Sequence, residues 1–189
     1  MSAGALYNAR TACLLWLTIL LAACGSTPPQ PDPGERWGFS GKIGLWAYGK
    51  QDSANIDWQD CASDYLIRLS GPLGVGGAVI YGNESGVSLH HGSDTPQRAS
   101  SPEELLASLG WYMPVSPLRF WLQGQAAPDR PFQRSPLSGG KIQELAQSGW
   151  QIRYDYRADR LSRIDMDNGD IRLKWIIREW RETARCQAP

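Results

Sequence analysis

The sequence predicts a mainly β fold, in which an antiparallel sheet is interrupted by two short α-helices. Two observations lead to this prediction. In several runs of the chain, apolar residues alternate with polar ones, which is the period of a strand with one buried face. Between these runs the apolar spacing becomes helical, and two Ser-Pro pairs mark helix starts. A sheet with one apolar face needs a cover, so we expect a curved sheet with the helices on its concave side.

The first part of the predicted sheet consists of five consecutive strands. Apolar alternation is seen in the runs Trp37 to Ala47, Ala54 to Trp58 and Tyr65 to Leu69, and the short runs Val75 to Tyr81 and Val87 to Leu89 follow. Polar turn residues separate the runs, and residues 82–86 (Gly-Asn-Glu-Ser-Gly) have the composition of a hairpin connection. This succession favours an antiparallel meander.

Two short helices are predicted after the meander. The first begins with the capping-box pattern of Ser101 and Glu104, has Pro102 at its first helical position, and ends at Gly110. The second begins at Ser116-Pro117 and ends at Gly124. Each helix has an apolar face, formed by Leu105, Leu106 and Leu109 in the first and by Leu118, Trp121 and Leu122 in the second.

Arg119 is the only charged residue of the second predicted helix. Two interpretations of it stay open: a hydrogen bond that holds the helix against the sheet, or a place on a solvated helix face.

The sheet is predicted to resume near the C-terminus. Apolar residues alternate again from Trp150 to Tyr156 and from Ile171 to Ile177. Asn168-Gly169 precedes the second run, and this dipeptide favours a tight hairpin turn with positive φ. The strands therefore lie on both sides of the helical segment in the sequence.

The N-terminus has the pattern of a bacterial lipoprotein signal. Arg10 precedes a short apolar run, and residues 21–24 (Leu-Ala-Ala-Cys) resemble the lipobox at which bacteria acylate the cysteine and cut before it. We therefore expect residues 1–23 to be a removed signal peptide and Cys24 to carry N-acyl and S-diacylglycerol groups. The alternative is an ordinary secretory signal with an incidental cysteine. Residues 24–35 are Pro-rich and predict a tether, which leaves residues 36–189 as a single domain.

Composition excludes some classes of function. The chain has 19 Lys and Arg against 19 Asp and Glu, whereas nucleic-acid binding needs a basic excess. The only two histidines are adjacent, His90 and His91, and neither Cys61 nor Cys186 has a second cysteine at metal-ligand spacing. We therefore predict no metal site and no nucleic-acid partner. In an oxidising compartment Cys61 and Cys186 either pair or remain free thiols near strand ends.

Several motifs, in their order and spacing, resemble the LolB family of outer-membrane lipoproteins. The resemblance extends from the lipobox to about Trp180. It is carried by residues 109–115 (Leu-Gly-Trp-Tyr-Met-Pro-Val) with Leu118, Trp121, Leu122 and Gly124, by Trp58-Gln59, by residues 65–67 and 71–74 (Gly-Pro-Leu-Gly), by Gly149-Trp150 and by residues 171–174 (Ile-Arg-Leu-Lys).

The resemblance implies an antiparallel incomplete (open) β-barrel with short α-helices covering its apolar concave face. It also implies that a monomer, lipid-anchored in the periplasmic leaflet of the outer membrane, accepts client lipoproteins from the periplasmic carrier LolA. Their acyl chains would be held in an apolar cavity and then inserted into outer-membrane lipid, with neither ATP nor a cofactor. Each CH₂ group kept out of water contributes about 0.8 kcal/mol, so such a relay avoids a large barrier.

The same resemblance implies the site residues. Leu73 lies in a Gly- and Pro-rich segment, where an exposed apolar tip would help to deliver the client into the membrane; the alternative is a leucine folded onto the core. The acyl-cavity candidates are Trp58, Leu105, Leu109, Trp111, Leu118, Trp121, Leu122 and Trp150. Ordinary core packing is the alternative for each of them, since cavity wall and core share the same chemistry.

Two other classes of function stay open at this point. A lipid or ester hydrolase has little support, because the chain contains neither a G-x-S-x-G nor an H-E-x-x-H motif. A structural or scaffolding outer-membrane lipoprotein would use the same lipobox and tether. Only the helical motif and the Leu73 segment favour the lipoprotein receptor over this second class.

Overall fold

The computed structural model describes residues 36–71, 77–109, 113–128, 130–182 and 184–186. The predicted signal peptide and tether therefore lie outside the described residues, as do Cys24, Leu73 and Trp111. The described residues belong to one compact unit, which contains the eleven-stranded sheet, its core and a disulfide.

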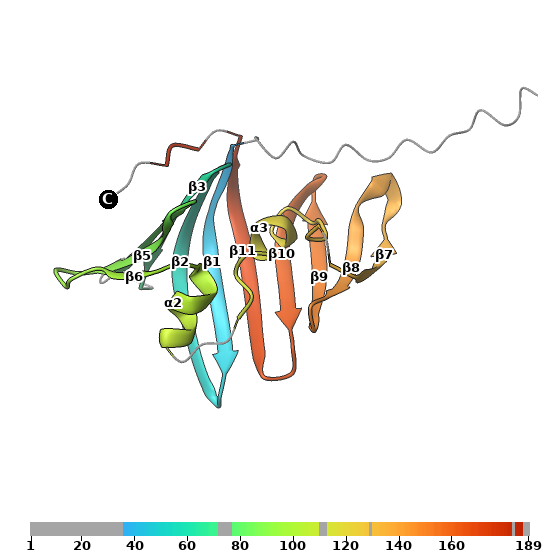
Figure 1. Ribbon diagram of the computed structural model, residues 1–189. Coiled ribbons are helices and arrows are strands. Elements are labelled where there is room, and N and C mark those ends of the chain that lie inside the picture. The colour runs from blue at the N-terminus through green and yellow to red at the C-terminus, as the bar shows by residue number, and fades with distance from the viewer. Residues whose placement is uncertain (1–35, 72–76, 110–112, 129, 183, 187–189) are drawn as a thin grey trace, which may run out of the picture. The chain divides into compact units, whose positions relative to one another are not determined.

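The fold prediction is confirmed: the unit is built on one open, antiparallel sheet of eleven strands with two short helices (Figure 1). The strands lie in the order β6-β5-β4-β3-β2-β1-β11-β10-β9-β8-β7, so β1 and β11 join an N-terminal half to a C-terminal half. Their bounds are β1 Trp37–Ala47, β2 Lys50–Cys61, β3 Asp64–Ser70, β4 Gly77–Asn83, β5 Gly86–His91, β6 Gln97–Ala99, β7 Phe132–Pro136, β8 Ile142–Gln147, β9 Trp150–Arg157, β10 Arg160–Asp167 and β11 Ile171–Arg181.

Four of these strands, β6, β7, β8 and β10, were not predicted. In β8 and β10 the buried apolar residues are three positions apart, at Ile142 and Leu145 and at Leu161 and Ile164. The pairing register shifts between these positions, so a bulge returns both side chains to the same face. Because a bulge inserts one extra residue, the apolar spacing in the sequence no longer shows the two-residue period of a strand. The edge strand β7 is exposed along its whole length and has no apolar period.

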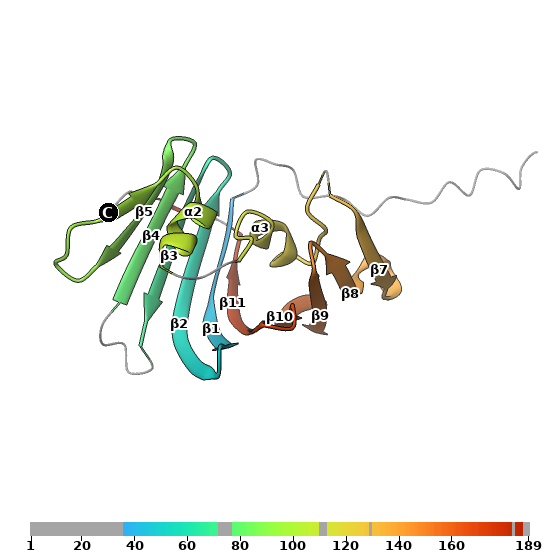
Figure 2. The same cartoon turned by 60° about the horizontal axis from the view of Figure 1, so that its bottom comes forward.

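Both helices lie on the same face of the sheet, which curves around them (Figures 1 and 2). Helix α2 (Pro102–Ser108) packs against β5 and β6, and helix α3 (Leu118–Trp121) lies in front of β11 and β10. As predicted, the Ser101 side chain accepts a hydrogen bond from the Glu104 N–H. The Glu104 carboxylate, however, accepts from Ser100, one residue before the expected partner. A short 3₁₀ helix, η2 (Ser138–Gly140), follows β7.

The core lies between the helices and the concave face. Five aromatic side chains pack together where β1, β2 and β11 meet, with neighbouring ring centroids 5.5–6.4 Å apart: Trp37, Phe39, Trp58, Trp175 and Trp180. In the C-terminal half the concave side chains continue this core and are almost fully buried: Leu145, Trp150, Ile152, Tyr154, Ile164, Met166 and Leu173. Much of the tryptophan content is thus accounted for by core packing.

Residues 184–186 lie against the end of the β2–β3 hairpin. Cys186 is disulfide-bonded to Cys61, with the Cα atoms 6.0 Å apart, which settles the open alternative in favour of pairing. The Arg185 N–H donates to the Gln59 side chain, and Ala184 is buried. The disulfide therefore attaches the end of the chain to the β2–β3 hairpin, 125 residues earlier in the sequence.

Candidate functional site on the concave face

The structure places most of the predicted cavity residues in the core of the concave side. Leu109 differs, because 40% of it is exposed at the end of α2. Trp121 and Trp150 lie together in the C-terminal half, with ring centroids 6.4 Å apart, whereas Trp58 belongs to the aromatic cluster near β1. The buried members of the predicted set are Trp58, Leu105, Leu118, Trp121, Leu122 and Trp150.

The concave face of the N-terminal half is less completely covered. Apolar side chains of β1, β3, β4 and β5 point to the same face as the core but remain partly exposed. We call this surface the open strip; it consists of Ile43, Leu45, Leu69, Ala78, Ile80 and Leu89. The sequence predicted through alternation that Ile43, Leu45 and Leu69 lie on an apolar face, but assigned no face to the others. It did not predict that these residues lie beside the covered core rather than within it.

One end of the α3 segment is anchored to the sheet by a buried amide, Gln147 of β8, which is 3% exposed. Its Oε1 accepts from Trp121 Nε1 at 2.7 Å and from the Ala127 N–H at 2.8 Å. Its Nε2 donates to the carbonyls of Ala127 and Arg130 at 2.9 and 3.2 Å. All four hydrogen-bonding positions of the amide are therefore used.

The other anchor of α3 is a buried carboxylate, Asp60 of β2, which is 1% exposed. Its Oδ1 accepts from Arg119 Nη2 at 2.7 Å and from the Ala62 N–H at 3.2 Å. The same Arg119 nitrogen donates to the Ala62 carbonyl at 2.8 Å. Of the two interpretations of Arg119, the structure supports the one in which it holds the helix against the sheet.

Three buried polar atoms near this second anchor have no hydrogen-bond partner among the described residues: Trp58 Nε1, Asp60 Oδ2 and the Tyr65 hydroxyl. We call Trp58, Asp60 and Tyr65 the β2–β3 polar cluster. Tyr65 is the cross-strand partner of Asp60, and its ring stacks on Trp58 at 6.3 Å. The three side chains therefore occupy one patch of the concave face. Of these three residues, the sequence predicted only Trp58 as a candidate site residue.

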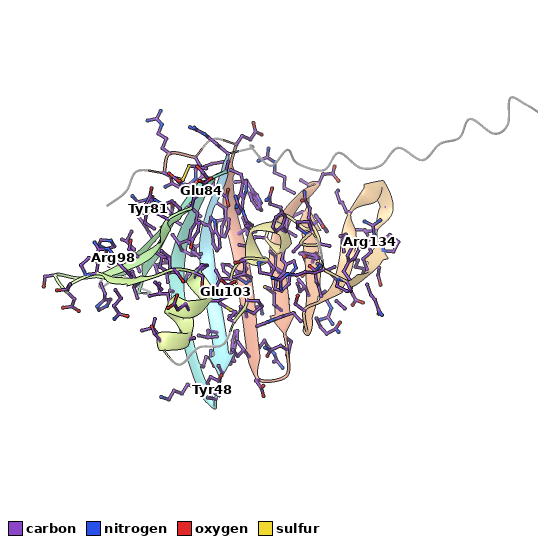
Figure 3. The ribbon with its side chains drawn as sticks, in the orientation of Figure 1. Tyr48, Tyr81, Glu84, Arg98, Glu103 and Arg134 are labelled. Carbon is purple, nitrogen blue, oxygen red and sulfur yellow. A yellow bond between two sulfur atoms is a disulfide. The ribbon has the colours of Figure 1, made fainter. Side chains whose placement is uncertain are left out.

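The electrostatics of the cluster reflect burial. Burial raises the pKa of the Asp60 carboxyl above its ordinary value, and the Arg119 guanidinium partly opposes this rise. Burial also raises the pKa of the Tyr65 hydroxyl to about 12; the charges of Glu103 and Asp60 raise it further, and Arg119 of α3 lowers it. Glu103 comes from α2, which lies in front of the sheet (Figure 3). Groups from both helices thus act on Tyr65.

The described part of the chain contains no cluster of three or more His, Cys, Asp or Glu side chains that could hold a metal ion. His90 contacts the Ser88 hydroxyl of its own strand at 3.2 Å. Among the helices that the structure describes, none is long and apolar enough to cross a membrane. The chemistry available on the concave face is therefore that of an apolar surface with a few buried polar groups.

Residues 35–180 match the family model described as outer membrane lipoprotein LolB. The chain belongs to the LolB family. The outer-membrane lipoprotein LolB of Chromohalobacter salexigens is 34% identical over 200 residues, covering 94% of this chain and 93% of the relative. The LolB of Nitrosococcus oceani is also 34% identical and covers 91% of this chain and 97% of the relative. The predicted family and its outer-membrane location are thereby confirmed.

A solved structure supports the fold independently of sequence. The crystal structure of a LolA superfamily protein from Nitrosomonas europaea aligns with a TM-score of 0.51, covering 83% of this chain and 89% of that chain at 11% identity. At that identity the likeness concerns the fold alone. The LolB family member described here thus shares its overall fold with that protein.

Proposed function

We propose that this protein receives lipoproteins from the periplasmic carrier LolA, holds their acyl chains against its concave face and inserts them into the outer membrane without ATP. The proposal includes acylation of Cys24, which would anchor the protein at the membrane where the clients end. No cofactor is needed, since every step is a transfer between apolar surroundings. We expect a monomer.

The observation that carries the proposal is the open strip. A packed sheet buries its apolar face, whereas here six apolar side chains of β1, β3, β4 and β5 stay partly exposed beside a helical cover. An apolar surface of this kind, next to short helices, is suited to acyl chains. An affinity only about 1.4 kcal/mol better than that of the carrier would favour transfer tenfold.

The direct test is transfer of a client from loaded carrier to residues 24–189 carrying Cys24→Ala, measured by separating the two proteins. We expect the client to move to this protein without nucleotide. Ile80→Asn, which makes the open strip polar, should reduce transfer at least tenfold. Ile176→Asn is the matched control, because Ile176 is 44% exposed on the opposite face. Absence of transfer to the unmodified domain would overturn the proposal.

Leu73 is proposed as the residue that delivers the client into the membrane. Leu73→Glu should leave client uptake intact and block release into liposomes, since a carboxylate is costly to place in a bilayer. Leu137→Glu serves as the control, because Leu137 is 37% exposed beyond the edge strand β7. Normal release by the Leu73 variant would show that this assignment is wrong.

A further inference from the structure

The β2–β3 polar cluster is an unusual feature of an otherwise apolar wall. Five buried side-chain atoms lack a hydrogen-bond partner within the described part of the chain, and three of the five belong to this cluster. Leaving a buried polar atom unsatisfied costs about 1–3 kcal/mol. A surface that only packed against α3 would be more stable with phenylalanine at position 65.

The cluster lies at the end of the open strip. Tyr65 and Leu69 are on the same strand face, four residues or roughly 13 Å apart at the rise of a strand. The Tyr65 ring extends over Gly82 of β4, where a Cβ atom would come within 2.4 Å of the hydroxyl oxygen. Only glycine leaves room for the phenol in this position. The polar atoms thus continue the apolar strip toward the β2–β3 turn.

We propose that Trp58, Asp60 and Tyr65 form a polar subsite that binds the groups through which acyl chains are joined to a lipoprotein's N-terminal cysteine. This inference rests on the proposed function and deepens it. The indole N–H and the phenol O–H are donors, which suit ester carbonyls. Asp60 Oδ2 is an acceptor, which suits the N–H of an acylated amine.

The helical cover is part of this proposal. Arg119 of α3 holds Asp60 Oδ1, and Glu103 of α2 accepts a hydrogen bond from the Ser116 N–H just before α3. Because Arg119 of α3 contacts Asp60, a ligand reaches the cluster when this contact opens. The ligand's carbonyl and amide groups then satisfy the cluster atoms that have no partner among the described residues.

Ester carbonyls occur in acylated cysteine and in diacyl phospholipids, whereas only the triacylated cysteine adds an amide N–H beside them. Three probes separate these sources: a triacylated cysteinyl peptide, the same peptide methylated at that amide nitrogen, and a short-chain diacyl phospholipid. Binding is measured by calorimetry on residues 24–189 carrying Cys24→Ala. A ¹³C label at the ester carbonyl reports its hydrogen bonding through the infrared stretching frequency.

We expect Tyr65→Phe and Trp58→Phe to weaken binding of the triacylated peptide about five- to tenfold and to raise the carbonyl frequency. The urea midpoint of Tyr65→Phe should not fall, since the hydroxyl has no partner among the described residues. Tyr154→Phe is the matched control: its hydroxyl is likewise buried with no partner in the described part of the chain, but in the other half of the sheet. It should leave binding unchanged.

Replacing Asp60 also removes the partner of Arg119, so a change in affinity alone would not be informative. The role of Asp60 is therefore tested by the preference between two peptides that differ only at the amide N–H. The unmodified domain should prefer the amide N–H peptide over its methylated form about tenfold, and Asp60→Asn should reduce this preference. Equal binding of both peptides and of the phospholipid would overturn the assignment of Asp60. Unchanged binding by Tyr65→Phe would mean that the cluster holds only water, and would overturn the subsite while leaving the proposed function intact. Failure of the unmodified domain to bind any acylated probe would instead overturn the proposed function.

Discussion

The two anchors of α3 differ in how completely their polar groups are satisfied. Gln147 is neutral and uses all four hydrogen-bonding positions on the C-terminal half of the sheet. Asp60 is a buried acid on the N-terminal half; one of its oxygens lacks a partner among the described residues, and its cation, Arg119, has a side chain 37% exposed. The helix is therefore held firmly on one side and loosely on the other.

This difference indicates where the cover opens. A buried, fully satisfied amide is expensive to separate from its partners, whereas an ion pair with a partly exposed arginine exchanges its bonds for water more readily. We therefore expect α3 to pivot at Gln147 and to separate first at Asp60. The open strip lies on the N-terminal half of the sheet, from which α3 is expected to separate. The separation would therefore expose more of the surface that is proposed to take up acyl chains.

The largest loss of stability is expected when the disulfide beside Asp60 is removed. Replacing both Cys61 and Cys186 with serine releases a closed loop of 125 residues, for which chain entropy gives about 4–5 kcal/mol of lost stability. Urea unfolding measures this loss, and amide hydrogen exchange locates it. Exchange should accelerate at the β2–β3 hairpin more than at the β8–β9 hairpin. Equal acceleration in both hairpins would contradict the idea that the two sides are held independently.

Gln147→Ala should have the next largest effect, about 3 kcal/mol of unfolding free energy. The substitution leaves the Trp121 indole N–H and the Ala127 N–H without their acceptor, and a buried unsatisfied group costs about 1–3 kcal/mol. Gln151→Ala, at an exposed position of β9, is the control and should change stability by less than about 0.5 kcal/mol. Similar unfolding curves for the two variants would contradict the conclusion that Gln147 holds α3 firmly against the sheet.

Arg119→Met should lower the free energy of unfolding by about 2 kcal/mol at neutral pH. This is less than the usual loss for a broken buried ion pair, because Arg119 is partly exposed. The pKa of Asp60 is already raised by burial and rises further once the opposing arginine is removed. A carboxyl whose pKa is higher in the folded than in the unfolded state lowers the free energy of unfolding at pH values above the folded-state pKa. This loss of stability disappears as the pH falls to the pKa of the unfolded state. The deficit of the variant should therefore shrink on acidification from pH 7.

The measurement for Arg119→Met is the unfolding free energy at several pH values between 7 and 4. Asp60→Asn combined with Arg119→Met is the control, since it has no carboxyl at this position. Its difference from Asp60→Asn alone, which also lacks the carboxyl, should not change over this pH range. A deficit that stayed constant or grew on acidification would show that Asp60 is not the group that titrates.

The sequence predicted the fold class and most strands, because uninterrupted alternation reports which side chains share a face. It missed β8 and β10, whose bulges change the apolar spacing, and the edge strands β6 and β7, which have no buried residue. It left the role of Arg119 open between two interpretations and named neither Asp60 nor Gln147 as an anchor of the helix. Asp60 and Arg119 are 59 residues apart, and Gln147 lies 26 residues from Trp121, so only the tertiary fold decides that these polar side chains are buried and paired.

The smallest predicted effect compares two buried tryptophans directly. Trp121→Phe and Trp58→Phe remove the same atoms from sites that are 0% and 3% exposed, so their packing losses should be similar. Only Trp121 also loses a hydrogen bond, the one to Gln147, whereas Trp58 Nε1 has no partner in the described ranges. Trp121→Phe should therefore destabilise the fold by about 1 kcal/mol more than Trp58→Phe in urea unfolding. Equal losses would mean that the indole of Trp58 is satisfied in solution, and the contrast between the two anchors would then be smaller than the structure indicates.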